Sequence, residues 1–190
     1  MRARFLLLLL LGCSLGLSPA LADQATRDGV ALDRQFSVNG EELTLFGYGT
    51  ARYARVFKVY VAGLYAPGDV APNEMLDKDV TRRLEIEYLR DIAADDINEA
   101  TDQLLRRQLD EESYAAVKDR FDYFAGLYQD IEAGDRYAFE YVPGEGGTLY
   151  FNGEKLGSVE GEDFARAYFG MWIGDDPMSA GLKRDLLGTR

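Results

Sequence analysis

Arg52 is the residue whose type and surroundings most clearly point to chemistry, because it can bind an anion. It lies within residues 45–65, after Gly47 and Gly49 and before a run of aromatic and β-branched side chains. Such a run is typical of a strand, and glycines at its start indicate that another backbone or a ligand comes close. A guanidinium there must reach water or pair with an anion, since a buried unpaired charge is costly. Arg52 is therefore either a binding residue or a surface arginine whose stem lies along the sheet.

The residue types that are absent exclude much catalytic chemistry. The sequence has no histidine and a single cysteine, Cys13. Serine–histidine and cysteine–histidine nucleophile systems, structural zinc sites and most transition-metal sites are therefore excluded. General acid–base chemistry would depend on Asp, Glu, Tyr or Lys. We expect neither a cofactor nor a metal.

Paired carboxylates occur at positions 95–96, 111–112 and 175–176. Each pair lies at or near the start of a predicted helix, where acidic side chains interact favourably with the helix dipole and cap free N–H groups. Nothing in the sequence pairs these acids across a cleft, and none has the spacing of a calcium-binding loop. We assign no catalytic residues.

Residues 1–22 have the pattern of an export signal peptide. Arg2 and Arg4 form a basic start, residues 5–11 form an apolar run, and residues 20–22 read Ala-Leu-Ala, a typical cleavage site. The apolar run is too short to cross a bilayer, so we expect no integral membrane span.

The expected mature chain is one domain, residues 23–190, located in the periplasm. An alternative is that residues 10–13 form a lipobox and that Cys13 becomes a lipidated N-terminus. The formal net charge of the whole chain is −12. This charge disfavours nucleic acid and a strongly anionic membrane as partners. The sequence leaves the oligomeric state open.

The periodicity of the chain predicts an α+β fold with a mostly antiparallel sheet and helices on one face. The predicted strands precede Asn39 and then span 42–46, 52–65, 82–89, 136–142, 148–152 and 155–159. A short helical turn is predicted at 72–76, and longer helices are predicted from 97, at 113–130, at 162–172 and from Pro177 to Gly188, with Asp176 as a cap. The aromatic stripe of the second long helix, which includes Phe121 and Phe124, indicates either core packing or the wall of a cavity.

Three stretches together resemble the chalcone isomerase-like family, in its bacterial exported branch. Residues 47–65 contain Gly-x-Gly-x-x-Arg followed by Lys-Val-Tyr-Val-Ala-Gly-Leu-Tyr, similar to the family's glycine–arginine and Lys-Val-Tyr-x-x-Gly-Leu-Tyr motifs. Residues 142–157 and 163–188 resemble the family's later strands and its aromatic helix, proline and Leu-Lys-x-x-Leu-Leu-Gly segment. The resemblance implies an open-faced β-sandwich with a ligand cleft between sheet and helices.

The resemblance also implies a site. The family includes plant flavonoid cyclases and fatty-acid-binding proteins, in which an arginine of the early strand holds the anionic end of the ligand; this position is Arg52. The hydroxyl-bearing position on the following strand is Tyr60, as in the binders. The apolar part of the ligand would contact Phe121, Phe124, Tyr168, Met171 and Trp172.

The further polar residues of the cyclases have no clear match, so the resemblance favours a periplasmic, non-catalytic binding protein for an apolar or amphipathic carboxylate such as a fatty acid. Two alternatives remain. One is an isomerase or lyase in which Arg52 stabilises an oxyanion. The other is an interaction module of the cell envelope whose cleft is filled by its own side chains.

Overall fold

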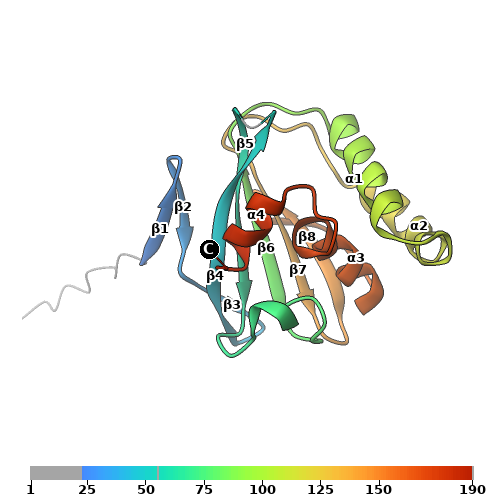
Figure 1. The fold of residues 1–190 in the computed structure, drawn as a ribbon, viewed down its shortest axis with the longest axis horizontal. Helices are drawn as coiled ribbons and strands as arrows, with labels where there is room; N and C mark the ends of the chain where they lie inside the picture. The colour runs from blue at the N-terminus through green and yellow to red at the C-terminus, as the bar shows by residue number, and fades with distance from the viewer. Residues whose placement is uncertain (1–22, 55, 190) are drawn as a thin grey trace, which may run out of the picture.

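The main sheet is an antiparallel meander in which each strand lies beside its neighbour in the chain (Figure 1). The computed structural model describes residues 23–54 and 56–189. Within these residues the sheet has seven strands: β3 Gln35–Val38, β4 Glu41–Tyr53, β5 Phe57–Ala66, β6 Arg82–Tyr88, β7 Arg136–Val142, β8 Gly146–Phe151 and β9 Glu154–Val159.

Helices cover one face of this sheet, as the sequence predicts (Figure 1). They are α1 Ala94–Gln108, α2 Glu111–Ala125, α3 Glu162–Ile173 and α4 Ala180–Leu186, with a short 3-10 turn, η1, at Pro72–Glu74. The main hydrophobic core lies between the helices and the sheet, and α3 contributes eight buried residues to it. None of the helices in the described part of the chain is long and apolar enough to span a membrane. The fold is α+β and confirms the predicted class.

A hairpin that the sequence analysis did not predict covers part of the other face of the sheet. It consists of β1 Gln24–Arg27 and β2 Val30–Asp33, paired antiparallel. Val30 and Leu32 of the hairpin pack against Val61 of β5, forming a small second cluster of buried apolar side chains. The sheet is therefore only partly open on the side that faces away from the helices.

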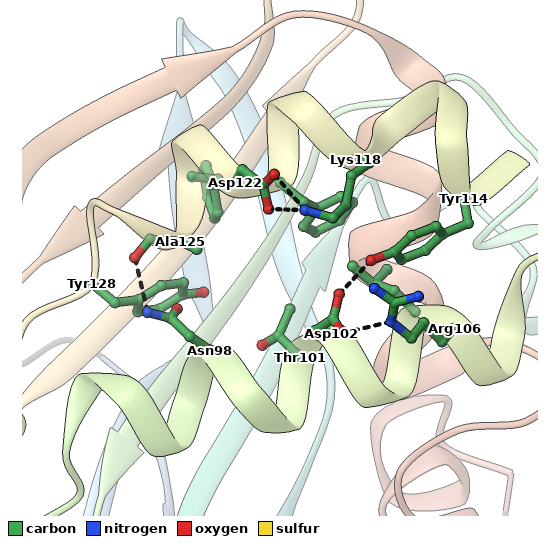
Figure 2. A pocket seen from close by; sticks show the side chains of 12 residues that line it. Asn98, Thr101, Asp102, Arg106, Tyr114, Lys118, Asp122, Ala125 and Tyr128 are labelled. Carbon is green, nitrogen blue, oxygen red and sulfur yellow. Dashed lines mark hydrogen bonds and ion pairs between the residues drawn. The ribbon is translucent and has the colours of Figure 1, made fainter.

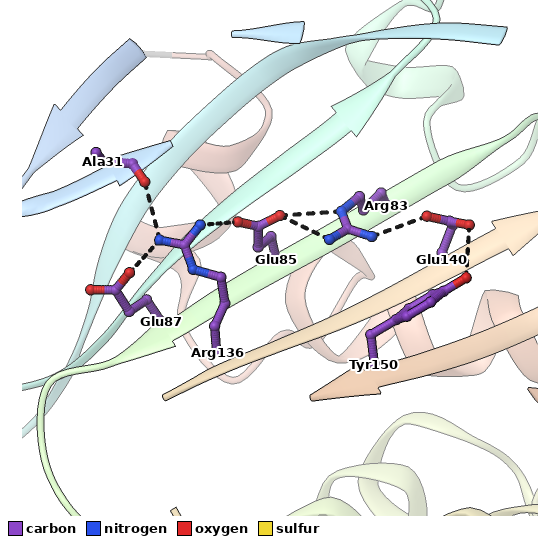
Figure 3. Close-up of polar contacts among 7 residues, drawn as sticks. All are labelled: Ala31, Arg83, Glu85, Glu87, Arg136, Glu140 and Tyr150. Carbon is purple, nitrogen blue, oxygen red and sulfur yellow. Dashed lines mark hydrogen bonds and ion pairs between the residues drawn. The ribbon is translucent and has the colours of Figure 1, made fainter. Parts of the chain in front are cut away.

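The strand β6 has two buried faces, whereas the sequence predicts one. The outward face carries a line of alternating charges that continues onto β7 (Figure 3). Arg83 donates hydrogen bonds to Glu85 at 3.1 and 3.2 Å and to Glu140 at 3.0 Å. Arg136 forms ion pairs with Glu85 and Glu87 and donates to a β2 carbonyl at 3.1 Å. These charges tolerate burial because each has an opposite charge and hydrogen bonds.

Arg82, at the start of β6, is buried on the helix side of the sheet. Its side chain is fully buried between the rings of Tyr141 and Phe169, whose centroids lie 5.3 and 5.1 Å from the guanidinium carbon. It donates to the carbonyl of Met75 at 2.8 Å, which fixes the chain just after η1. Burial lowers the pKa of Arg82. The arginine joins the loop after β5 to the core.

The predicted long strand 52–65 is wrong: the chain turns back within it. β4 ends at Tyr53, the amide of Val56 donates to the carbonyl of Tyr53 at 3.2 Å, and β5 begins at Phe57. Ala54 adopts a φ of 49°, a conformation that glycine or asparagine usually supplies. The turn therefore carries no residue that marks it in the sequence. Arg52 consequently lies at the end of β4 rather than inside a strand.

The glycines at the start of the family-like segment mark a close backbone approach, which confirms their predicted role. A Cβ atom at Gly47 would lie 2.3 Å from the backbone oxygen of Leu186, and one at Gly49 would lie 2.6 Å from the Cβ of Asp185. β4 also has a register shift between Leu45 and Gly47. The absence of side chains at both glycines lets α4 lie directly on β4.

Three predicted helix boundaries differ from the structure by three residues or more. The first long helix begins at Ala94 instead of 97. The last helix begins at Ala180, and the hydroxyl of Ser179 caps it by accepting from the amide of Leu182 at 3.2 Å. The sequence analysis expected Asp176 and Pro177 at this start because a proline after an acidic cap is a common signal. The second long helix ends at Ala125 instead of 130. At the last helix the structure uses the serine cap, which is as good as the aspartate that we expected.

Candidate functional site

An apolar cavity of about 180 Å³ lies between α1 and α3 on one side and β5, β6 and β7 on the other. It is lined by Val59, Tyr60, Ile86, Tyr88, Ile92, Asp96, Ile97, Ala100, Thr101, Leu104, Tyr128, Tyr137, Tyr168, Met171, Trp172 and Met178. Asp96 is the one charged residue among these. An engineered cavity of about 150 Å³ with apolar walls binds benzene, so a space of this size accepts a single ring or a short acyl chain.

Tyrosine side chains form much of the cavity wall, and most of their hydroxyls are already paired. The Tyr60 hydroxyl accepts from the indole N–H of Trp172 at 3.0 Å and lies 2.7 Å from the sulfur of Met178. The hydroxyls of Tyr128 and Tyr168 are 2.8 Å apart. Burial raises the pKa of Tyr60 and Tyr168 well above the usual value, so both remain neutral phenols.

Tyr88, on β6, is the exception among the tyrosines that line the cavity. Its hydroxyl has no hydrogen-bond partner among the described residues, although the ring contacts the rings of Tyr60 and Tyr137. Burial raises the pKa of Tyr88 well above its usual value, so the phenol stays protonated and can donate. Tyr88 is thus the hydroxyl that a ligand in the cavity can use. The alternation of Leu84, Ile86 and Tyr88 along β6 was the sequence signal that could have identified it.

The residues predicted to contact the apolar part of a ligand fall into two neighbouring hollows. Tyr168, Met171 and Trp172 line the apolar cavity, and so does Tyr60, which was predicted to bind the head group. Phe121 and Phe124 instead line a cleft of about 290 Å³ between α1 and α2, shown in Figure 2. The cleft adjoins the cavity, because Thr101 and Tyr128 line both.

The α1–α2 cleft is less suited to a charged ligand than its polar rim suggests (Figure 2). Arg106 donates to Asp102 at 2.7 Å, and Tyr114 also donates to Asp102. Lys118 pairs with Asp122 on the next turn of α2. Each charge on the rim therefore has a partner within the chain, and a ligand would have to displace one of them.

Arg52 lies away from the apolar cavity, and the structure does not bring it together with Tyr60. A register shift separates Ala51, which pairs with Tyr60, from Arg52, which pairs with Lys58. Arg52 approaches Asp28 of the β1–β2 turn at 4.0 Å, on the hairpin side of the sheet, whereas Tyr60 belongs to the core beneath the helices. Ala51 and Arg52 are consecutive in β4, so their side chains point to opposite faces of the sheet, and Arg52 faces away from Tyr60. The predicted carboxylate clamp of Arg52 and Tyr60 is therefore not formed.

The anion that Arg52 meets is a side chain of the chain itself. Asp28 also forms an ion pair with Lys58 at 2.5 Å and accepts a hydrogen bond from Thr50. These partners, Lys58 foremost and then Thr50, hold the pKa of Asp28 below its usual value. An internal carboxylate thus lies 4.0 Å from the guanidinium at which we expected the carboxylate of a ligand.

Comparisons with known proteins agree with the fold and with the resemblance. A family model described as chalcone isomerase-like matches residues 24–188. A crystal structure of a fatty-acid binding protein from Arabidopsis thaliana superposes with a TM-score of 0.69, at 14% sequence identity, over 87% of this chain and 96% of that one. At that identity the likeness establishes a shared fold. No curated protein matches the chain. Among the residues that the structure describes, no group of His, Cys, Asp and Glu could hold a metal ion.

Proposed function

This chain belongs to the chalcone isomerase-like family, and from that premise we propose that it is an exported, non-catalytic binding protein for a small apolar carboxylic acid. The observation that carries the proposal is the apolar cavity between α1, α3 and the sheet, with its single unpaired tyrosine hydroxyl. Likeness in fold to a fatty-acid binding protein supports the same class of ligand. The signal peptide predicted for residues 1–22, which lie outside the described residues, supports a periplasmic location.

The size of the cavity limits the buried part of the ligand. A volume of about 180 Å³ accommodates a ring or a short acyl segment, and each buried CH₂ group contributes about 0.8 kcal/mol of transfer free energy. A long fatty acid would leave much of its chain outside. The ligand is therefore a small carboxylic acid or a larger one of which only one end enters. A hydroxyl or carbonyl on the buried part would bind Tyr88.

The carboxylate would lie at the mouth of the cavity, because the cavity wall supplies no cation. We define the mouth as the open depression that shares Val59, Ile92, Asp96 and Ala100 with the cavity. Arg90 lines this depression, is exposed, and has no partner within the described residues. Asp91, Asp96 and Glu99 also line the mouth, so Arg90 is the one group there that can hold a carboxylate while the apolar part is buried.

Blocking the passage at Ala100 is expected to weaken ligand binding by about tenfold or more, because a large side chain there would fill space that the ligand needs. The variant is Ala100→Phe, on the α1 wall that the cavity and the mouth share. Isothermal titration with hexanoate and phenylacetate measures the effect. Ala115→Phe is the matched control, since Ala115 is an exposed residue of α2. Equal affinities in the two variants would place the ligand elsewhere.

Replacing Arg90 with glutamine is expected to weaken carboxylate binding about threefold, in line with the 0.2–1 kcal/mol of an exposed ion pair. The affinity for the corresponding alcohol should not change, because the alcohol carries no charge. Arg52→Gln is the comparison, since Arg52 lies on the hairpin side of the sheet. A large loss of carboxylate affinity in Arg52→Gln, with none in Arg90→Gln, would instead restore the Arg52 clamp implied by the family resemblance.

A further inference from the structure

The turn between β4 and β5 exposes an unusual amount of apolar surface. Tyr53, Val56 and Phe57 are 71, 68 and 59% exposed, and we call these three residues the tip. Two other large hydrophobic side chains of the described chain, Tyr123 and Met178, are also classed as exposed, and they lie elsewhere. Grouped apolar side chains that face water usually mark an interaction surface.

Basic residues flank the tip on both strands. Arg52 precedes Tyr53 and Lys58 follows Phe57, and their side chains are 37 and 45% exposed. One acid, Asp28, lies within ion-pair distance of both, so the flanks keep a net positive charge. The complete chain, in contrast, has a formal net charge of −12. The tip is therefore an apolar patch with basic flanks on an acidic protein, which is complementary to an anionic surface with an apolar interior.

The tip is continuous with the mouth of the apolar cavity. Tyr53 lines the mouth together with Val59, and Val59 also lines the cavity. The antiparallel order of the sheet places the β4–β5 turn at the same end as the connection from β6 to α1, which carries Arg90 (Figure 1). A molecule that leaves the surface on which the tip rests would therefore meet the mouth first.

We propose that the tip docks on an anionic lipid surface and that this contact brings the mouth of the cavity to the membrane. Val56 and Phe57 insert between the lipid headgroups, and Arg52 and Lys58 contact the phosphates beside them. The acidic residues Asp91, Asp96 and Glu99 lie on the α1 side of the mouth and oppose a flat approach. The contact is therefore confined to the tip, and the net charge of the whole chain does not prevent it.

Co-sedimentation with vesicles tests this proposal. The chain from Asp23 onward is used, because it contains every described element and lacks the apolar leader, which would itself bind lipid. The vesicles contain either equal parts of phosphatidylglycerol and phosphatidylcholine or phosphatidylcholine alone. The double variant Val56→Ser/Phe57→Ser is expected to lose about tenfold or more in partition to the anionic vesicles. Tyr123→Ser, which changes an exposed aromatic residue of α2, should change partition by less than about twofold.

Two results would overturn the proposal. One is wild-type protein that does not bind anionic vesicles, and the other is a tip variant that binds them as well as Tyr123→Ser does. If the tip instead binds a second copy of this chain, sedimentation velocity will show self-association of the wild type that the tip variant lacks. Hexanoate titration without vesicles should give the same affinity for the tip variant and the wild type. Failure of the membrane contact and failure of ligand binding are therefore separate outcomes.

Discussion

Replacing Gly47 with alanine is expected to lower the free energy of unfolding by about 3 kcal/mol, at the upper end of the range for overpacked sites. The added Cβ would lie 2.3 Å from the backbone oxygen of Leu186 and 2.4 Å from that of Asp185. Backbone atoms cannot move aside by a change of rotamer, so α4 must shift as a unit or separate from β4. Chemical denaturation followed by circular dichroism measures the loss.

Gly68→Ala is the control for this prediction. A Cβ at Gly68 would lie 3.8 Å from the nearest atom, the Thr44 hydroxyl oxygen, which is an ordinary contact. The free energy of unfolding of Gly68→Ala should therefore stay within about 0.5 kcal/mol of that of the wild type. A loss of less than about 1 kcal/mol in Gly47→Ala would mean that α4 moves away from the sheet easily. The helix would then be a mobile cover rather than a fixed part of the core.

Arg136→Met is expected to lower the free energy of unfolding by about 3 kcal/mol. This is the lower end of the range observed when one partner of a buried ion pair is removed. The network on the outward face contains two arginines and three glutamates, so its net charge is already negative. Loss of Arg136 leaves Arg83 as the one cation for three carboxylates. Glu85 is the most affected, because its side chain is 7% exposed and has little access to water.

A surface arginine of similar exposure provides the control for this second prediction. The side chain of Arg120 is 31% exposed against 33% for Arg136, but its partner Asp163 is 57% exposed. Arg120→Met should therefore lose less than about 1 kcal/mol. Adding Glu87→Gln to Arg136→Met should recover part of the stability, because one uncompensated carboxylate is removed. A double variant less stable than Arg136→Met would contradict this account of the network.

Local patterns in the sequence predicted the parts of the fold that depend on local rules. The stripe on the second long helix faces the core as expected, with Val117, Phe121 and Phe124 buried. Gly47 and Gly49 predicted a close approach of other atoms, which α4 supplies. The alternation along 82–88 predicted β6. In each case the signal itself lies in residues that are neighbours along one element, even where, as at the glycines, the partner comes from a distant one.

The parts that the sequence did not reveal depend on contacts between distant segments. The turn at Ala54 has no glycine, proline or asparagine, so the end of β4 and the whole of β5 were predicted as one strand, 52–65. The register shift beside Arg52 decides which face that arginine occupies, and it leaves no mark in the composition. Alternation alone predicts that Glu85 and Glu87 face solvent. Glu85 is buried and Glu87 is partly buried, because Arg136, about fifty residues later, pairs with both, and Arg136 in turn donates to the β1–β2 hairpin.

The hydrogen bond between Trp172 and Tyr60 has a spectroscopic consequence. Trp172 is the single tryptophan of the chain and forms part of the cavity wall, so all of the indole emission of the protein originates there. The Tyr168 ring centroid lies 5.2 Å from that of Trp172, close enough for excitation energy to pass between them. Indole emission depends on the polarity of its surroundings and on what its N–H contacts. The protein therefore carries its own fluorophore for occupancy of the cavity, without any added label.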